Sequence, residues 1–192
     1  MHTKNTVVII GASTGGFKIV RKIFSGLPVL NAGIIIVQHM LWSVNEAFKE
    51  KLNGDTGMEV KIAEDGDGIE AGKVYIAPSG LHLRLTNNTK IRLFDDGKVN
   101  AVRPSIDVTM KSLKSGPEDG IIGVILTGMG KDGVEGIIHI KALGGVTVAQ
   151  DRDTSAIYGM PKAAVETGHV DFALTPEKIS DKLTELCGIM GN

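Results

Sequence analysis

The fold of this chain is decided by residues 6–16, which read TVVIIGASTGG. The first five residues are all β-branched and form a continuous run, which is typical of a strand buried on both faces of a parallel sheet. The glycines after this run favour a tight turn. Apolar residues at helical spacing over 16–26 then indicate a helix that ends at Gly26 and Pro28. Strand, glycine-rich turn and helix together predict an α/β fold.

The alternation of strand and helix continues along most of the chain. Buried strands are expected at 33–37 and 121–126, further strands at 146–150 and 170–174, and helices at 43–53, 106–115, 133–143, 161–167 and from Pro176 onward. Short strand-like segments stand at 59–63 and 73–77. Segments 81–85 and 90–94 alternate apolar and polar residues around a turn-rich linker, which predicts a half-exposed antiparallel hairpin. We therefore expect one domain over 1–192, a three-layer α/β/α fold with a mostly parallel central sheet and an antiparallel hairpin.

The composition is that of an ordinary globular protein of 192 residues, 42% hydrophobic and 22% charged. Lys plus Arg number 21 against 22 Asp plus Glu, so charge gives no reason to expect nucleic acid or a membrane surface as a partner. The single cysteine, Cys187, cannot form an internal disulfide, which indicates a reducing cytoplasm, and it lacks the neighbours of a thiol nucleophile. No apolar run approaches the roughly 20 residues that span a bilayer, and no signal peptide precedes the first strand.

Three residues with chemical potential follow three of the predicted strands. Ser13 follows the first strand, His39 follows the second, and Asp132 stands in the turn after 121–126. Because ligand sites of parallel sheets lie beyond the carboxyl ends of the strands, we expect these side chains to meet. A serine hydroxyl becomes a nucleophile when an imidazole takes its proton, and a carboxylate orients that imidazole. The pattern predicts a serine hydrolase.

The turn at 11–15, GASTG, also fits the Gly-x-Ser-x-Gly elbow, in which small residues permit a sharp strand-to-helix turn. The competing interpretation is a phosphate-binding loop. Ser13 stands where a dinucleotide-binding fold needs its second glycine, and the second strand ends in Gln38 and His39 rather than in an acid. We therefore favour a hydrolase over a nucleotide site.

Each candidate has a plainer interpretation. Ser13 could be a helix N-cap, His39 a hydrogen-bonded histidine at a strand end, and Asp132 an N-cap for the helix after it. A non-catalytic binding module, and an esterase or amidase for another protein substrate, also stay open. We expect the remaining histidines to be surface or structural residues, because none has metal-ligand spacing: His2, His82, His139 and His169.

Six sequence blocks resemble the catalytic domain of the bacterial chemotaxis methylesterase family, CheB. The resemblance extends over about residues 6–175, and the blocks stand in the family's order. They are IGASTGG at 10–16, VQHM at 37–40, VYIAPSG at 74–80, RPSIDV at 103–108, GVILTGMGKDG at 123–133 and YGMPKAA at 158–164.

The resemblance implies hydrolysis of glutamate methyl esters on the cytoplasmic helices of chemoreceptors, during chemotaxis adaptation, with release of methanol and without a cofactor. Some members also deamidate receptor glutamines. The family triad falls on Ser13, His39 and Asp132. The resemblance also places Met129 near the oxyanion site and Thr14 next to the histidine. The chain order Ser–His–Asp differs from that of α/β-hydrolases, so the elbow does not indicate that fold.

The N-terminus departs from the usual family pattern, in which a phosphorylated receiver domain precedes this domain. Met1 stands only a few residues ahead of the first predicted strand. Two interpretations stay open: an excised catalytic piece, whose receiver domain lies outside this chain, or a natural stand-alone domain, which could act in another signalling system. Leu41 and Trp42, expected to be exposed after His39, and the hairpin near 81–94 are where a receptor helix could dock.

Overall fold

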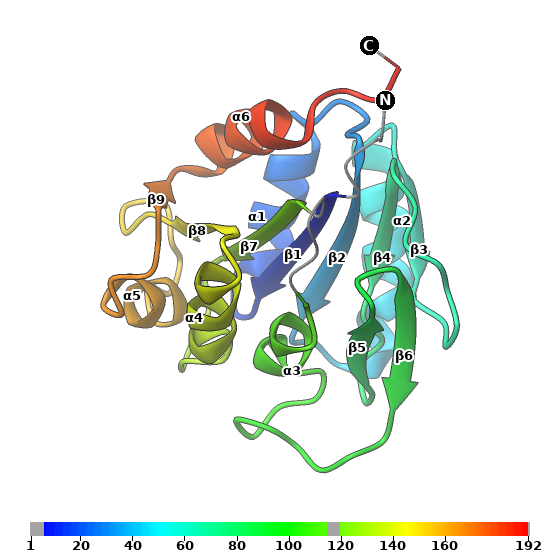
Figure 1. The fold of residues 1–192 in the computed structure, drawn as a ribbon, viewed down its shortest axis with the longest axis horizontal. Helices are drawn as coiled ribbons and strands as arrows, with labels where there is room; N and C mark the ends of the chain where they lie inside the picture. Colours follow the sequence, from blue (N-terminus) through cyan, green and yellow to red (C-terminus); the bar gives the residue numbers. More distant parts are fainter. Residues whose placement is uncertain (1–5, 115–119, 192) are drawn as a thin grey trace.

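The computed structural model describes residues 6–114 and 120–191 of the chain. Its main sheet is wholly parallel and has the strand order β3-β4-β2-β1-β7-β8-β9, while β5 and β6 form a separate antiparallel hairpin (Figure 1). The strands are β1 Thr6–Ala12, β2 Ala32–Gln38, β3 Glu59–Ile62, β4 Lys73–Ile76, β5 His82–Thr86, β6 Lys90–Phe94, β7 Gly120–Ile125, β8 Val146–Gln150 and β9 Phe172–Leu174. The helices are α1 Gly16–Phe24, η1 Trp42–Val44 (a 3₁₀ turn), α2 Asn45–Asp55, α3 Ile106–Lys111, α4 Val134–Ala142, α5 Met160–Val165 and α6 Pro176–Cys187.

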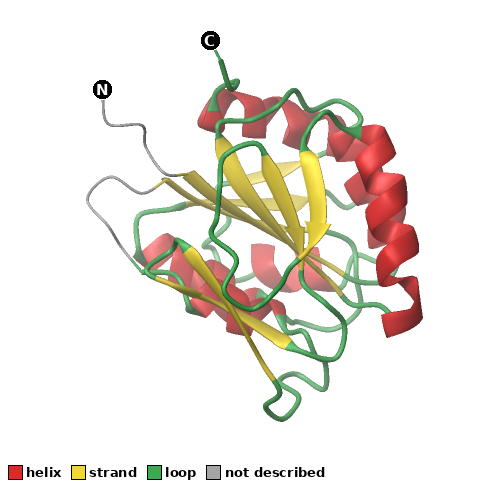
Figure 2. Ribbon diagram, turned by 90° about the vertical axis from the view of Figure 1, so that its right-hand side faces the viewer, coloured by secondary structure: helices red, strands yellow, loops and turns green. Residues whose placement is uncertain are grey.

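Helices cover both faces of the sheet, as the predicted three-layer fold requires (Figure 2). Helices α1, α2 and α6 pack with Val8 and Ile10 of β1 in one apolar core, whereas α3, α4, α5 and the hairpin pack with Val7 and Ile9 in the other. Every residue of β1 is buried. Burial on both faces is why this strand reads as a continuous β-branched run and not as an alternating one. The predicted fold class is confirmed.

Some element boundaries differ from the expectation. Helix α3 ends at Lys111, earlier than the predicted 115, and residue 115 itself lies outside the described residues. The hydroxyl of Ser112 donates to the Thr109 carbonyl (2.6 Å) and accepts from the Leu85 backbone N–H (2.8 Å), so the chain turns toward the hairpin there. Segments 59–63 and 73–77 contribute β3 and β4 to the main sheet. Within the described residues, no helix is both long and apolar enough to cross a bilayer.

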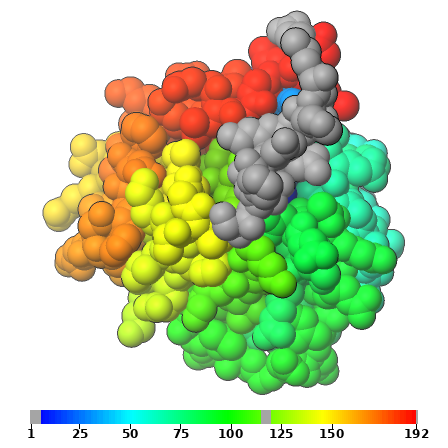
Figure 3. Space-filling view, in the orientation of Figure 1, coloured from blue at the N-terminus to red at the C-terminus, as the bar shows by residue number. Residues whose placement is uncertain are grey.

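The strand order determines where a site can form. Strand β1 lies between β2 and β7. After β1 the chain first forms the strands on the β2 side of the sheet, and from β7 onward it forms the strands on the other side. The carboxyl ends of these three strands are therefore neighbours at a topological switch point, the usual place for a ligand in such sheets. In Figure 3 the hairpin and the loop after it, coloured green, form the lower flank of the molecule at this end.

Candidate active site

Ser13 is the first residue after β1, and its backbone is held from both neighbouring strands. Its N–H donates to the Thr127 carbonyl beyond β7 (3.0 Å), and its carbonyl accepts from the side chain of Gln38 at the end of β2 (2.9 Å). The Gly16 N–H donates to the same carbonyl (2.9 Å), which closes the turn into α1. The turn that presents Ser13 is therefore fixed by hydrogen bonds from three directions.

Close packing explains the small residues around Ser13. A Cβ added to Gly128 would lie 2.6 Å from the Ser13 Cβ, and one added to Gly16 would lie 2.4 Å from Oε1 of Gln38. Gly15 adopts φ 82°, a conformation that L side chains rarely take. The glycines around the serine are thus required by close contacts at Gly16 and Gly128 and by backbone conformation at Gly15.

His39 is the first residue after β2 and lies beside Ser13. The register pairs Ala12 with Gln38, and the His39 N–H donates to the Ala12 carbonyl (3.0 Å), so the two residues occupy matching positions on adjacent strands. Within the described residues, the Ser13 hydroxyl is not hydrogen-bonded to the His39 ring. Such contacts often tighten only when substrate binds.

The His39 ring is bonded to Asp132, with 2.9 Å between Nε2 and Oδ2. A carboxylate can only accept, so Nε2 carries the hydrogen and Nδ1 is the basic nitrogen of the neutral ring. The His39 side chain is 13% exposed and that of Asp132 is 4% exposed, which leaves the base accessible and its partner protected from solvent. The geometry is that of a base oriented by a carboxylate.

Asp132 is surrounded by hydrogen-bond donors. Burial alone would raise the pKa of this carboxyl, but hydrogen bonds from His39, Asn100, Ser105 and the Ile106 backbone outweigh burial and lower the pKa below its ordinary value. The donors besides His39 are Asn100 Nδ2 (2.8 Å), Ser105 Oγ (2.7 Å), Ile106 N (2.7 Å) and Asp107 N (3.2 Å). Asp132 therefore stays ionised beside the imidazole.

The helix-cap interpretations of Ser13 and Asp132 are wrong. The residue at the N-cap of α1 is Gly15 and that of α4 is Gly133, both with left-handed backbone and neither with a side-chain cap. The Asp132 carboxylate instead accepts the backbone N–H groups at the start of α3, a helix earlier in the chain. Asp132 therefore caps the N-terminus of α3, which is distant in sequence, and not that of α4, which follows it directly.

The site depends on residues that sequence reasoning did not assign to it. Ser105 is the N-cap of α3, since its hydroxyl accepts from the Val108 N–H (3.4 Å), and the same hydroxyl donates to Asp132. Asp107 accepts from the Gly136 N–H of α4 (2.8 Å). Ser105 and Asp107 both stand in the RPSIDV block at 103–108, so the family resemblance was the signal that could have assigned them to the site. For Asn100 the sequence carried no signal of a link to Asp132.

Two predicted neighbours of the triad lie at the surface. Thr14 and Met129 are exposed, the latter by 68%, and the Thr14 carbonyl accepts from the Thr127 hydroxyl (3.0 Å). Because the Ser13 N–H is already bonded to Thr127, an oxyanion would need donors from neighbouring residues. The roles of Thr14 and Met129 stay predictions.

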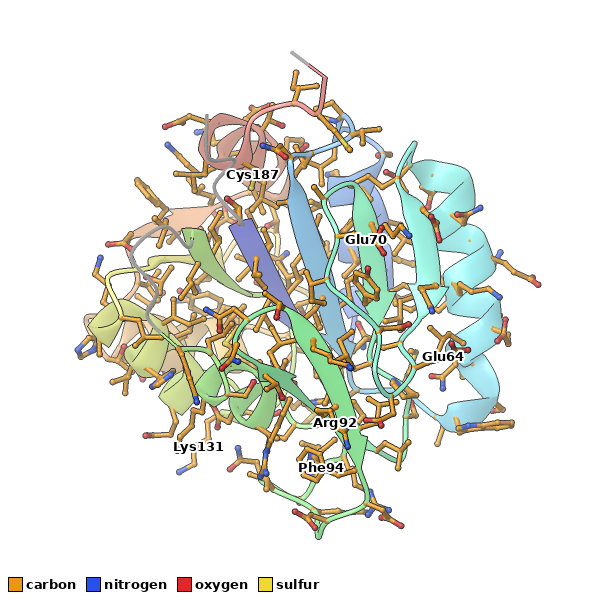
Figure 4. The ribbon with its side chains drawn as sticks, turned by 45° about the vertical axis from the view of Figure 1, so that its right-hand side comes forward. Glu64, Glu70, Arg92, Phe94, Lys131 and Cys187 are labelled. Atoms are coloured by element: carbon orange, nitrogen blue, oxygen red, sulfur yellow. The ribbon has the colours of Figure 1, made fainter. Side chains whose placement is uncertain are left out.

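Other titratable candidates lie away from this chemistry. Cys187 is at the opposite end of the molecule from Lys131, the neighbour of Asp132 (Figure 4), and burial raises the pKa of its thiol to about 12. His82 is buried, where Nδ1 accepts from the Ser105 N–H (3.2 Å) and Nε2 contacts the Gly97 carbonyl (3.0 Å). His82 is thus a structural residue beneath the start of α3, and Cys187 is a core residue.

The surface around His39 is open and partly apolar. Leu41 and Trp42 are 75% and 76% exposed, as predicted, in the turn that follows the base. A hydrogen bond from the Ser79 hydroxyl to the Met40 carbonyl (2.8 Å) fixes this turn. An open rim of this kind suits a side chain brought by a large partner.

Comparison with known proteins gives one consistent family. The family model described as CheB methylesterase matches residues 8–183. The chain is 42% identical over 187 residues to a protein-glutamate methylesterase/protein-glutamine glutaminase of Pyrococcus horikoshii, covering 95% of this chain and 51% of that protein. It is 41% identical to the protein of the same name from Thermotoga maritima, covering 94% of this chain and 54% of that protein. The chain thus spans about half the length of these relatives.

A solved structure shares the fold. The CheB methylesterase catalytic domain of Thermotoga maritima superimposes with a TM-score of 0.87 at 38% sequence identity, covering 95% of this chain and 98% of that one. Sequence blocks, strand order and family model therefore agree over nearly the whole chain. This chain belongs to the CheB methylesterase family.

Proposed function

We propose that this chain is a serine hydrolase that removes methyl esters from glutamate side chains of chemoreceptors. The observation that carries the proposal is the His39–Asp132 contact beside Ser13, because Asp132 fixes the ring so that Nδ1 is left to take a proton. The names of the relatives, protein-glutamate methylesterase/protein-glutamine glutaminase, supply the substrate class. No cofactor is required by this chemistry, and cytoplasmic receptor helices are its expected partners in the cytoplasm.

The reaction follows the two-step course of acyl transfer. The Ser13 hydroxyl attacks the ester carbonyl while Nδ1 of His39 takes its proton, and the imidazolium is stabilised by Asp132. His39 then protonates the departing oxygen, so methanol leaves and a glutamyl ester of Ser13 remains. Water, deprotonated by His39, attacks that ester and releases glutamate and Ser13. With a glutamine substrate the same steps would release ammonia.

Backbone N–H groups near Ser13 and Met129 are the donors that we assign to the oxyanion. The Ser13 N–H itself is excluded because it donates to Thr127. Thr14 follows Ser13 in the chain, Met129 follows the Gly128 that packs on the Ser13 Cβ, and both are exposed. Such donors typically contribute a few kcal/mol to the transition state.

The test is methanol release from a methylated receptor. Ser13→Ala should lose activity by about a thousandfold or more, since the nucleophile is gone, yet it should fold because alanine keeps the Cβ that packs on Gly128. Ser25→Ala is the matched control, since Ser25 is an exposed serine at the far end of α1 and should keep full activity. Equal methanol release from Ser13→Ala and the wild type would contradict the proposal.

A further inference from the structure

One amide links the two buried carboxylates of the site. Nδ2 of Asn100 donates to Oδ2 of Asp107 (2.7 Å) and to Oδ1 of Asp132 (2.8 Å). The carboxylates themselves are 6% and 4% exposed. Asn100 is therefore the one side chain, among the described residues, that donates to both.

The shared amide lies between two buried carboxylates whose negative charges repel each other. Burial, together with the nearby charge of Asp132, raises the pKa of Asp107, against the hydrogen bonds from Gly136 and Asn100. Within the described residues, neither carboxylate forms an ion pair with a lysine or arginine, and His39 is the only titratable base bonded to Asp132. A neutral donor shared by both groups reduces their repulsion without adding a charge.

Three further charged side chains line a cavity that also borders Asn100 and Asp107. Its volume is about 480 Å³, and its lining includes Arg84 of the hairpin, Lys111 of α3 and Glu135 of α4. Arg84 also lies over the Phe94 ring, 4.1 Å from its centroid. Because these charged groups line the cavity, the hydrogen bond to Asp132 comes from Asn100 and not from them.

The backbone delivers the amide in a fixed position. Asn100 and Ala101 both have positive φ, 54° and 63°, and stand at the centre of a tight turn closed by two hydrogen bonds between Val99 and Val102 (3.2 and 3.0 Å). Two central residues with positive φ define a type I′ turn, for which asparagine is well suited. The turn thus explains an asparagine at this position and restricts where its side chain can reach.

We propose that Asn100 is a positioning residue for the hydrolysis: by bridging Asp107 and Asp132, it holds the triad carboxylate in the orientation that fixes the His39 ring. The proposal rests on the proposed function for its kinetic consequence. Its structural part, the effect on the His39–Asp132 bond, does not require any substrate. Two kinds of measurement therefore test it separately.

The first test removes the amide and keeps the turn. Asn100→Gly tolerates positive φ, so the backbone should persist. We expect kcat for methanol release to fall by about tenfold, as is typical when a residue that orients a functional group by a hydrogen bond is removed, with KM within about twofold of the wild type. In substrate-free protein, the downfield NMR signal of the His39 Nε2 proton should shift or broaden. Asn87→Gly, the same change at another positive-φ residue in the β5–β6 turn, is the control and should alter neither reading.

The second test is a double-mutant cycle with Asp107→Asn, which removes one of the two charges and keeps an oxygen for the Gly136 N–H. If Asn100 acts by separating two carboxylates, the double variant should recover at least half of the logarithmic loss in kcat seen in Asn100→Gly. A purely structural role predicts additive losses. Asn100→Asp, which keeps the shape but replaces the donor by an acceptor, should lose more activity than the glycine variant.

The outcomes separate the two proposals. An unchanged imidazole signal in Asn100→Gly, additive losses in the cycle, or wild-type activity in Asn100→Asp would each overturn the role of Asn100. Absence of ester hydrolysis by the wild type would overturn the proposed function instead, and the imidazole signal would still decide whether Asn100 positions the pair. If the glycine variant unfolds, Asn100→Asp provides the decision, because kcat and the imidazole signal can both be measured in that variant.

Discussion

At the scale of single residues, Asp107 and Asp132 show how two carboxylates in one site acquire opposite properties. Both are buried, but Asp132 receives five hydrogen bonds and has a lowered pKa, whereas Asp107 receives fewer, from Gly136, Asn100 and Gly133, lies near the charge of Asp132 and has a raised pKa. The number of donors, and not the depth of burial, decides which of them carries a stable charge. The charge stabilised in this way is the one that touches the imidazole.

Asp107 makes a prediction about pH and stability. A carboxyl whose folded pKa is raised binds protons more strongly in the folded state, so it stabilises below its unfolded pKa of about 3.9 and loses that contribution as pH rises through the folded pKa. Asp107→Asn lacks this titration. The free energy of unfolding of the variant, measured in urea from about pH 4 to about pH 8, should therefore improve relative to the wild type as pH rises. A difference that is constant with pH would contradict the assignment.

At the scale of elements, helices α3 and α4 stabilise each other's first turns. Asp132, just before α4, accepts from the first N–H groups of α3, and Asp107, in the first turn of α3, accepts from the Gly136 N–H of α4. Each carboxylate lies at the positive end of the partner helix. The helices also approach closely, since a Cβ on Gly136 would lie 2.6 Å from the Cβ of Met110.

Two helical glycines give a matched pair of substitutions. Gly136→Ala should destabilise the fold by about 1–3 kcal/mol, because the added methyl must push α3 from α4. Gly54→Ala in α2 has no atom within 4 Å of the new Cβ, so it should stabilise by about 0.5–1 kcal/mol through helix propensity. Urea unfolding of both variants checks the sign of each change in the free energy of unfolding. Destabilisation by Gly54→Ala would contradict the expected gain from helix propensity.

At the scale of the whole molecule, the fold brings together residues that the sequence keeps far apart. The continuous apolar runs at 6–10, 33–37 and 121–126 were enough to predict the parallel sheet, because burial on both faces leaves that mark. The patterns do not encode which strands are neighbours. Placing β1 between β2 and β7 is what unites Ser13 with residues 39 and 132.

The parts that sequence reasoning missed are those set by contacts between distant segments. Asp132 resembles a cap for its own helix, yet its partners are His39 and residues within 100–107, and only tertiary packing shows this. Asn100 has a positive φ, which the known preference of asparagine for such turns can suggest from sequence. The contact of its side chain with two carboxylates depends on the tertiary structure. Helix α3 ended early because Ser112 bonds to the hairpin, another non-local cause.

The single tryptophan reports on the open rim of the site. Trp42 is 76% exposed, so its fluorescence in the folded protein should already resemble that of an indole in water, and unfolding in urea should move the emission maximum very little. Addition of a methylated receptor should move the maximum to shorter wavelength if the rim is covered, with Ser13→Ala used to prevent turnover. A large red shift on unfolding alone would place the indole in a protected environment.

The central position of β1 also bears on how the protein is made. Thr6 pairs with Gly120 across β1 and β7, so during synthesis one edge of β1 has to wait for a strand from the second half of this chain. At ordinary rates of translation that interval is on the order of ten seconds. During synthesis the elbow with Ser13 therefore precedes the strand that completes its surroundings, and the proposed hydrolytic site can be complete only after translation has passed β7.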